Sequence, residues 1–123
     1  MIIYNYINLF SKLETILKLK NIFYIYLVLY EDNNLNKINI AYKKFNKIKN
    51  HKLEKFGIKS DNISVDFQLK NNVIVVYFTD IKKIKKIIKN NHIIVDKYSD
   101  NSIYINMNKY GDILMNNLIY LLI

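Results

Sequence analysis

The sequence predicts an α+β fold with antiparallel sheets. In some segments apolar residues recur every three or four positions, which is typical of an amphipathic helix, and in others they alternate with polar residues, which is typical of a half-buried strand. Short polar turns separate the alternating segments, so neighbouring strands are expected to be antiparallel. Because the chain has only 123 residues, we expect two small subdomains, at 1–78 and 79–123, that pack as one compact unit.

The first subdomain is predicted to have the order α-β-α-β-β. Residues 6–20 carry apolar side chains on one helical face, and the run IFYIYLVLY at 22–30 is short, β-branched and aromatic, as in a buried strand. A polar turn at 31–34 precedes a second helix. The apolar spacing that begins at Leu35 predicts that this helix ends near Asn50.

The last two strands of the first subdomain are predicted to form a hairpin. Residues 63–69 alternate apolar and polar side chains more regularly than any other segment. The pair Asn71 and Asn72 then forms a tight turn, because asparagine tolerates the left-handed backbone conformation that such turns need. The run VIVVYF at 73–78 is the returning strand.

The second subdomain is predicted to be mainly antiparallel β structure with one short helix. Residues 79–80, threonine and aspartate, are expected to cap a helix at 81–91. A second hairpin follows, with strands at 92–98 and 102–107. A last strand is predicted at 117–123.

The chain is strongly basic. Its formal net charge is +9, and all 19 basic residues are lysines. Such a charge favours a polyanionic partner, with nucleic acid as the first choice and an anionic membrane as the second. In the helix predicted at 81–91, lysines surround an apolar stripe of isoleucines and would contact phosphates; a solvated face in a lysine-biased protein is the equally supported alternative. These lysines are Lys82, Lys83, Lys85, Lys86 and Lys89.

The composition also bears on the source of the gene. Isoleucine, asparagine and lysine make up half of the chain, whereas proline, cysteine, tryptophan and arginine are absent. The favoured residues have AT-rich codons, which indicates an AT-rich genome. An organelle genome is the first interpretation, and a reduced bacterial or nuclear genome is the alternative.

No enzymatic site is expected. The two histidines lack metal-ligand spacing, and the ten carboxylates are scattered along the chain. The sequence contains no phosphate-binding glycine loop and no nucleophile motif. We therefore expect no cofactor, no metal and no small-molecule substrate. No apolar run approaches the roughly 20 residues that span a bilayer, so no membrane span is expected.

Several stretches resemble the eighth protein of the bacterial-type small ribosomal subunit. YINLFSKLETILKLK is similar to the first helix of that family, LEKFGI at 53–58 to the end of its second helix, and NISVDFQLKNNVIVVYF to its central hairpin. SIYINMNKYGDIL and NLIYLLI are similar to its next strand with the following loop and to its closing strand. The resemblance implies that the C-terminal half binds small-subunit ribosomal RNA beside neighbouring ribosomal proteins.

By position, the resemblance also implies an RNA-contacting loop. This loop would consist of Asn106, Met107, Asn108, Lys109, Tyr110 and Gly111. Gly111 would let the backbone turn closely against RNA. Lys97 is expected to add a phosphate contact, and Tyr104 or Tyr110 would offer a ring on which a base stacks.

The sequence therefore predicts a non-enzymatic structural constituent of an organellar ribosomal small subunit, with the mitochondrion as first choice and the plastid as second. The alternative comes from another class of protein. It is a small organelle-encoded accessory subunit of a respiratory or ATP-synthase complex, in which apolar segments at 22–30 and 113–123 would contact membrane proteins.

Overall fold

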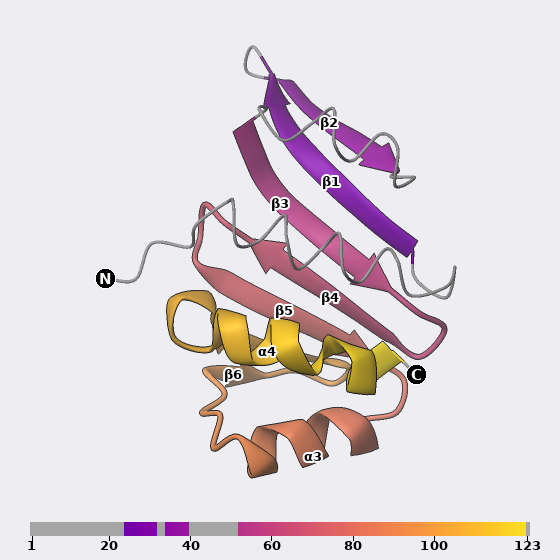
Figure 1. The fold of residues 1–123 in the computed structure, drawn as a ribbon, viewed down its shortest axis with the longest axis vertical. Helices are drawn as coiled ribbons and strands as arrows, with labels where there is room; N and C mark the ends of the chain where they lie inside the picture. Colours follow the sequence, from indigo (N-terminus) through magenta and orange to yellow (C-terminus); the bar gives the residue numbers. More distant parts are fainter. Residues whose placement is uncertain (1–23, 32–33, 40–51, 123) are drawn as a thin grey trace.

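The computed structural model describes residues 24–31, 34–39 and 52–122. These residues form a seven-stranded antiparallel sheet and two helices (Figure 1). The strands are β1 (Tyr24–Glu31), β2 (Asn34–Asn39), β3 (Lys52–Lys59), β4 (Ile63–Gln68), β5 (Val73–Phe78), β6 (Lys97–Tyr98) and β7 (Ser102–Asn106), and the helices are α3 (Lys82–Asn90) and α4 (Met107–Leu122). The predicted α+β class with antiparallel pairing is thus confirmed.

The strand order in the sheet is β2-β1-β3-β4-β5-β7-β6. The sheet includes strands from both sides of residue 78, because β5 pairs with β7. The division into subdomains 1–78 and 79–123 stays a prediction. The helix predicted at 6–20 lies outside the described residues.

The hairpin of β4 and β5 forms as the alternation predicts. Asp66 pairs with Val75, and Phe67 pairs with Ile74. Asn72 takes a φ of 54° in the connecting turn, a left-handed conformation that asparagine adopts at lower cost than most residues. This turn also anchors the C-terminal helix, since the Asn72 carbonyl accepts a hydrogen bond from the Met107 N–H at 2.9 Å.

The helix predicted from Leu35 onward is wrong over the part that the structure describes. Residues 34–39 form β2, in which Leu35 pairs with Tyr30 and Ile38 pairs with Leu27 of β1. The helical spacing of Leu35 and Ile38 is a local signal. Pairing with β1 supplies backbone partners and apolar neighbours that this local signal does not contain. Residues 40–51 lie outside the described part of the chain.

The stretch 53–58, which the resemblance places at the end of a helix, belongs to strand β3 instead. Phe56 and Ile58 are fully buried two positions apart, as expected for one face of a strand. The Phe56 ring stacks on Phe67 of β4 with 4.4 Å between the ring centroids. This contact between neighbouring strands explains why the segment is extended.

The strand predicted at 117–123 is also wrong over residues 117–122, because these residues belong to helix α4, which spans 107–122. Its buried side chains recur at the helical spacing of three and four residues. They are Met107, Tyr110, Leu114, Met115, Leu118 and Leu121. The strand prediction considered only the apolar run at the end of the chain and missed this longer period, which begins ten residues earlier.

Both described helices pack on one face of the sheet. Helix α4 lies against β4, β5 and β7, and α3 packs beside α4 (Figure 1). Strand residues of this face, such as Val76 and Ile105, join helix residues such as Ile84 and Leu118 in one buried cluster. Each fully buried side chain of this size stabilises the fold by about 1.5–3 kcal/mol. The core therefore fixes the relative position of α3 and α4.

Candidate nucleic-acid interface

Helix α3 forms as the isoleucine spacing predicts. Ile84 and Ile87 are buried against the sheet and α4. At the start of the helix the Asp80 carboxylate accepts a hydrogen bond from the Lys82 N–H at 3.0 Å. This bond satisfies one of the backbone donors that a helix N-terminus leaves without an intrahelical partner. The N-cap residue itself is Ile81, which makes no side-chain cap hydrogen bond, so the predicted capping by residues 79–80 is wrong in position: Asp80 lies one residue before the cap.

The end of α3 is closed by backbone hydrogen bonds. The Ile93 N–H donates to the Ile88 carbonyl at 3.0 Å, and the His92 N–H donates to the Lys89 carbonyl at 3.4 Å. His92 takes a φ of 52°, in the place where such helix ends usually have glycine. Ile93 then returns to the core, so the helix end is held firmly beside α4.

The outer surface of α3 is cationic. All five lysines predicted as phosphate contacts are exposed: Lys82, Lys83, Lys85, Lys86 and Lys89. They lie within a helix of nine residues, and the first turn contains no acidic residue. Ammonium groups gathered on one short helix create a local positive potential that attracts polyanions.

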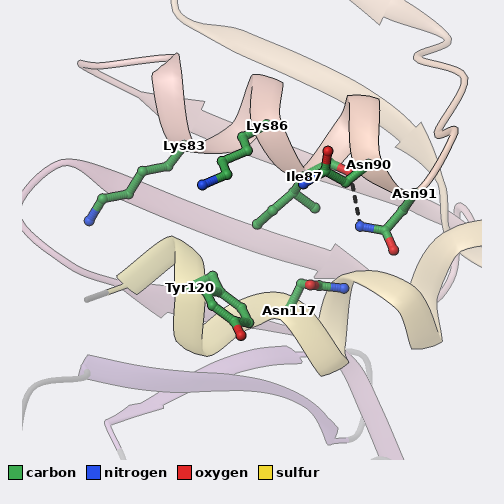
Figure 2. A pocket seen from close by; sticks show the side chains of 7 residues that line it. All are labelled: Lys83, Lys86, Ile87, Asn90, Asn91, Asn117 and Tyr120. Carbon is green, nitrogen blue, oxygen red and sulfur yellow. Dashed lines mark hydrogen bonds between the residues drawn. The ribbon is translucent and has the colours of Figure 1, made fainter.

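A groove of about 530 Å³ separates α3 from α4 (Figure 2). One wall comes from α3 and the residue after it, and the other comes from α4. The lining residues are Lys83, Lys86, Ile87, Asn90, Asn91, Asn117 and Tyr120. Only Ile87 has an aliphatic side chain, whereas small-molecule pockets are predominantly apolar. The groove therefore offers ammonium, amide and phenol groups to a ligand beside apolar surface from Ile87 and the Tyr120 ring.

Two amides in the groove are held by the helices. The Asn91 side chain donates to the Ile87 carbonyl at 3.0 Å, the dashed line in Figure 2. The Asn117 side chain donates to the Ile113 carbonyl at 2.8 Å. Each amide thereby uses one of its N–H groups and has a carbonyl oxygen and a second N–H with which it can contact a ligand.

The groove combines three kinds of contact that nucleotides use. Lys83 and Lys86 supply ammonium groups for phosphates, and the asparagines supply donors and acceptors for sugars or base edges. Tyr120 is 72% exposed and offers a ring for base stacking. Among the described residues, no cluster of histidine and acidic side chains could hold a metal ion.

The loop conformation predicted for residues 106–111 is wrong, whereas the RNA contact of these residues stays a prediction. Residues from Met107 onward form the first turns of α4, and Tyr110 and Gly111 are buried. Tyr110 is only 7% exposed and packs in the core, so its ring is not available to a base. Gly111 has no positive φ. It lies buried inside α4, so it does not serve the turn that the prediction assigned to it.

The remaining residues of the predicted loop have separate positions. Asn106 ends β7 and accepts a hydrogen bond from the Lys109 N–H at 3.0 Å through its side-chain oxygen. Asn108 is half-buried, and Lys109 is exposed with its ammonium 5.9 Å from the centre of the Tyr110 ring. These residues start a helix and do not form a loop.

The cap at Asn106 gives a first testable prediction. Asn106→Ala should lower the free energy of unfolding by about 0.5–2 kcal/mol, because the Lys109 N–H loses its acceptor at the helix N-terminus. Asn108→Ala, inside the first turn, is the matched control and should change stability by less than about 0.5 kcal/mol. Urea denaturation followed by circular dichroism measures both. Equal losses in the two variants would contradict the capping role.

Lys97, also predicted as a phosphate contact, is exposed on β6 and pairs with Tyr104 of β7. It does not line the groove.

The sequence does not predict Asn117 and Tyr120 as site residues, because it predicts a strand at 117–123. The helical spacing of the apolar residues from Met107 to Leu121 is the signal that would have placed both on the surface beside α3.

The fold and site define an α+β chain with a lysine-rich helix beside a polar groove. No protein-family model, no curated protein and no solved structure matches this chain. In the part of the chain that the structure describes, no helix has the length and hydropathy to cross a membrane.

Proposed function

We propose that the protein binds RNA through α3 and the α3–α4 groove, as a structural constituent of an organellar ribosomal small subunit. The observation that carries the proposal is the set of five exposed lysines on α3 beside a groove walled by asparagines and Tyr120. Each lysine that neutralises a phosphate releases a condensed counterion, so binding is favourable and salt-dependent. No reaction is needed for this role.

The absence of arginine limits how the site recognises RNA. Lysine is a mobile point charge without the planar fork that pairs with guanine or with phosphate through two parallel hydrogen bonds. The lysines therefore position the backbone, while Asn90, Asn91 and Asn117 contact sugars or base edges. Such a site recognises the shape of a folded RNA more than its sequence, as expected for a structural ribosomal protein.

The ribosomal and mitochondrial parts of the proposal have their own support. The ribosomal part is supported by the resemblance of several stretches to the eighth small-subunit protein, and the mitochondrial part is supported by the AT-rich composition. The hairpin of β4 and β5 agrees with that resemblance. Three other segments differ from the secondary structure that the resemblance implies, namely 53–58, 107–111 and 117–122. RNA binding by α3 does not depend on the resemblance.

The alternative function, an accessory subunit of a membrane complex, uses the apolar segments 22–30 and 113–123 as contacts. In α4 the apolar residues Leu114, Leu118 and Leu121 are already buried in the core of the protein. A segment that packs inside its own fold has little apolar surface left for a partner. The burial of these leucines therefore weakens the part of the alternative that uses residues 113–123.

Fractionation of organelles tests the proposed function. We expect a tagged chain to sediment with the ribosomal small subunit on a sucrose gradient and to move to the top of the gradient after ribonuclease treatment. Ultraviolet cross-linking should recover small-subunit ribosomal RNA. Retention in carbonate-washed membranes without cross-linked ribosomal RNA would support the membrane-complex alternative instead.

A further inference from the structure

Helix α3 carries its polar side chains in two rows. The inner row lines the groove beside α4 (Figure 2) and consists of Lys83, Lys86 and Asn90. The outer row is exposed, none of its members lines the groove, and it consists of Lys82, Lys85 and Lys89. Within each row the residues are three or four positions apart, so they are neighbours on one helix face. The two rows can therefore contact different parts of one RNA.

The groove has the size of a site for a single small ligand. Its volume of about 530 Å³ lies within the range of roughly 300–1,000 Å³ that small-molecule pockets have. Its two walls are held together by the core, since Ile84 of α3 and Leu118 of α4 belong to one buried cluster. Base pairs inside a duplex are stacked and present only their edges. The groove therefore fits one nucleotide that has left the stack better than a run of stacked pairs.

The groove also offers apolar surface to the face of a base. Ile87 is only 6% exposed and lines the groove between the two helices. Tyr120 lines the opposite wall and is 72% exposed, so its ring is open to a ligand. Proteins commonly hold unstacked bases on aromatic rings. Only an unpaired base can present a whole face to such a ring, because neighbours in the stack cover the faces of a paired base.

Amides on both walls match the polar edges of a base. The Asn91 side chain donates to the Ile87 carbonyl at 3.0 Å, and the Asn117 side chain donates to the Ile113 carbonyl at 2.8 Å. These bonds fix the direction in which each amide presents its carbonyl oxygen and its second N–H. An unpaired base exposes edges that pairing hides in a duplex, and these edges carry both donors and acceptors. The two walls can therefore contact one base from different sides.

The charge beside the groove matches the phosphates that flank such a nucleotide. Lys86 is exposed and lines the groove, and none of the described lining residues is acidic. An extruded nucleotide remains joined through its phosphates to the duplex that it left. The adjoining duplex therefore lies next to the groove, where the outer row of α3 supplies three further ammonium groups.

We propose that the groove binds one unpaired nucleotide, extruded from a bulge or loop of RNA, while the outer row of α3 holds phosphates of the adjoining duplex. This inference rests on the proposed function and names the RNA structure that the site recognises. Binding of RNA by charge alone is indifferent to pairing. Binding through the groove instead depends on a base outside the stack, and this dependence can be measured.

The test compares two fluorescently labelled, blunt-ended RNA duplexes by anisotropy. One is fully paired, and the other has the same sequence with a single unpaired nucleotide in one strand. The wild type should bind the bulged duplex at least about fivefold more tightly, because stacking on a ring is added to the phosphate contacts. Tyr120→Ala should bind the two duplexes with equal affinity. Tyr120→Phe keeps a ring and should retain the preference.

Matched controls separate the groove from its surroundings. Asn117→Ala should reduce the preference for the bulged duplex, whereas Asn116→Ala should not, because Asn116 is exposed on the same helix and does not line the groove. Tyr98→Ala removes a tyrosine on β6 that is 63% exposed and should retain the preference. A preference that survives in Tyr120→Ala, or that is lost equally in Tyr98→Ala, would overturn the proposal.

A second measurement uses the unaltered chain, so that it does not depend on the folding of a variant. We expect 4-thiouridine at the bulged position to cross-link to residues 110–123. This peptide follows the last lysine of the chain and contains Asn117 and Tyr120. The same nucleoside at a paired position should not cross-link to it. Cross-links of the bulged position that miss residues 110–123 would overturn the proposal.

The outcomes separate this inference from the proposed function. Lys82→Glu/Lys85→Glu, in the outer row, should weaken binding of both duplexes alike, because it removes phosphate contacts. Equal affinity of the wild type for the two duplexes would overturn the inference and leave RNA binding by α3 in place. Binding of neither duplex would overturn both.

Discussion

The variant Lys83→Glu/Lys86→Glu should bind RNA at least about tenfold more weakly than the wild type at moderate salt. Both lysines line the groove beside α3, and each substitution replaces an attraction to phosphate with a repulsion. The salt dependence should change as well. The slope of the logarithm of affinity against the logarithm of salt concentration should fall by about 2, since two phosphate contacts are lost. Anisotropy titrations at several salt concentrations measure both effects.

A matched control separates the site from the net charge. Lys70→Glu/Lys109→Glu changes the net charge by the same amount, and both residues are exposed and outside α3. It should lose less affinity than the α3 variant. Lys109 belongs to the loop that the sequence predicted as an RNA contact, so this control also tests that idea. An equal loss in the two variants would show that binding follows overall charge, without a site on α3.

The parts of the fold that could be predicted are those whose signal is local. In β4 apolar and polar side chains alternate, as in a strand with one apolar face, and Asn72 supplies the backbone conformation that the turn to β5 needs. In α3 the isoleucine stripe fits one helix face and leaves the lysines outside. Each of these segments is specified by its own residues, because pattern and turn agree.

The parts that failed depend on contacts distant in the sequence. Leu35 and Ile38 have helical spacing, yet pairing with β1 decides their conformation. The polar residues 106–111 have the composition of a loop, yet the bond from Lys109 N–H to Asn106 and the burial of Tyr110 make them the start of a helix. Composition alone cannot separate a loop from a capped helix start, since asparagine favours both.

The candidate site was predictable only in part for the same reason. The lysines of α3 are visible in the sequence as a charged helix face. The opposite wall of the groove, with Asn117 and Tyr120, exists only because α4 is a helix that packs beside α3. The sequence places Lys86 and Tyr120 in different segments, and no local pattern connects them.

Leu118→Ala should lower the free energy of unfolding by about 2–5 kcal/mol. Leu118 is fully buried in α4 against the sheet, and its truncation leaves a cavity. Tyr120→Ala is the matched control. Tyr120 is 72% exposed on the same helix, so its loss should change stability by less than about 0.5 kcal/mol. Urea denaturation measures both, with the midpoint and the slope fitted separately.

This pair of variants tests the conformation of the C-terminal segment directly. In a helix, residues two positions apart lie on different faces, whereas in a strand they lie on the same face. If residues 117–122 were the strand that the sequence predicted, Leu118 and Tyr120 would be buried or exposed together, and both substitutions would have similar effects. A large loss for Leu118→Ala with little change for Tyr120→Ala requires the helix. Because α4 forms one wall of the groove, similar losses would also remove the structural basis for the proposed RNA site.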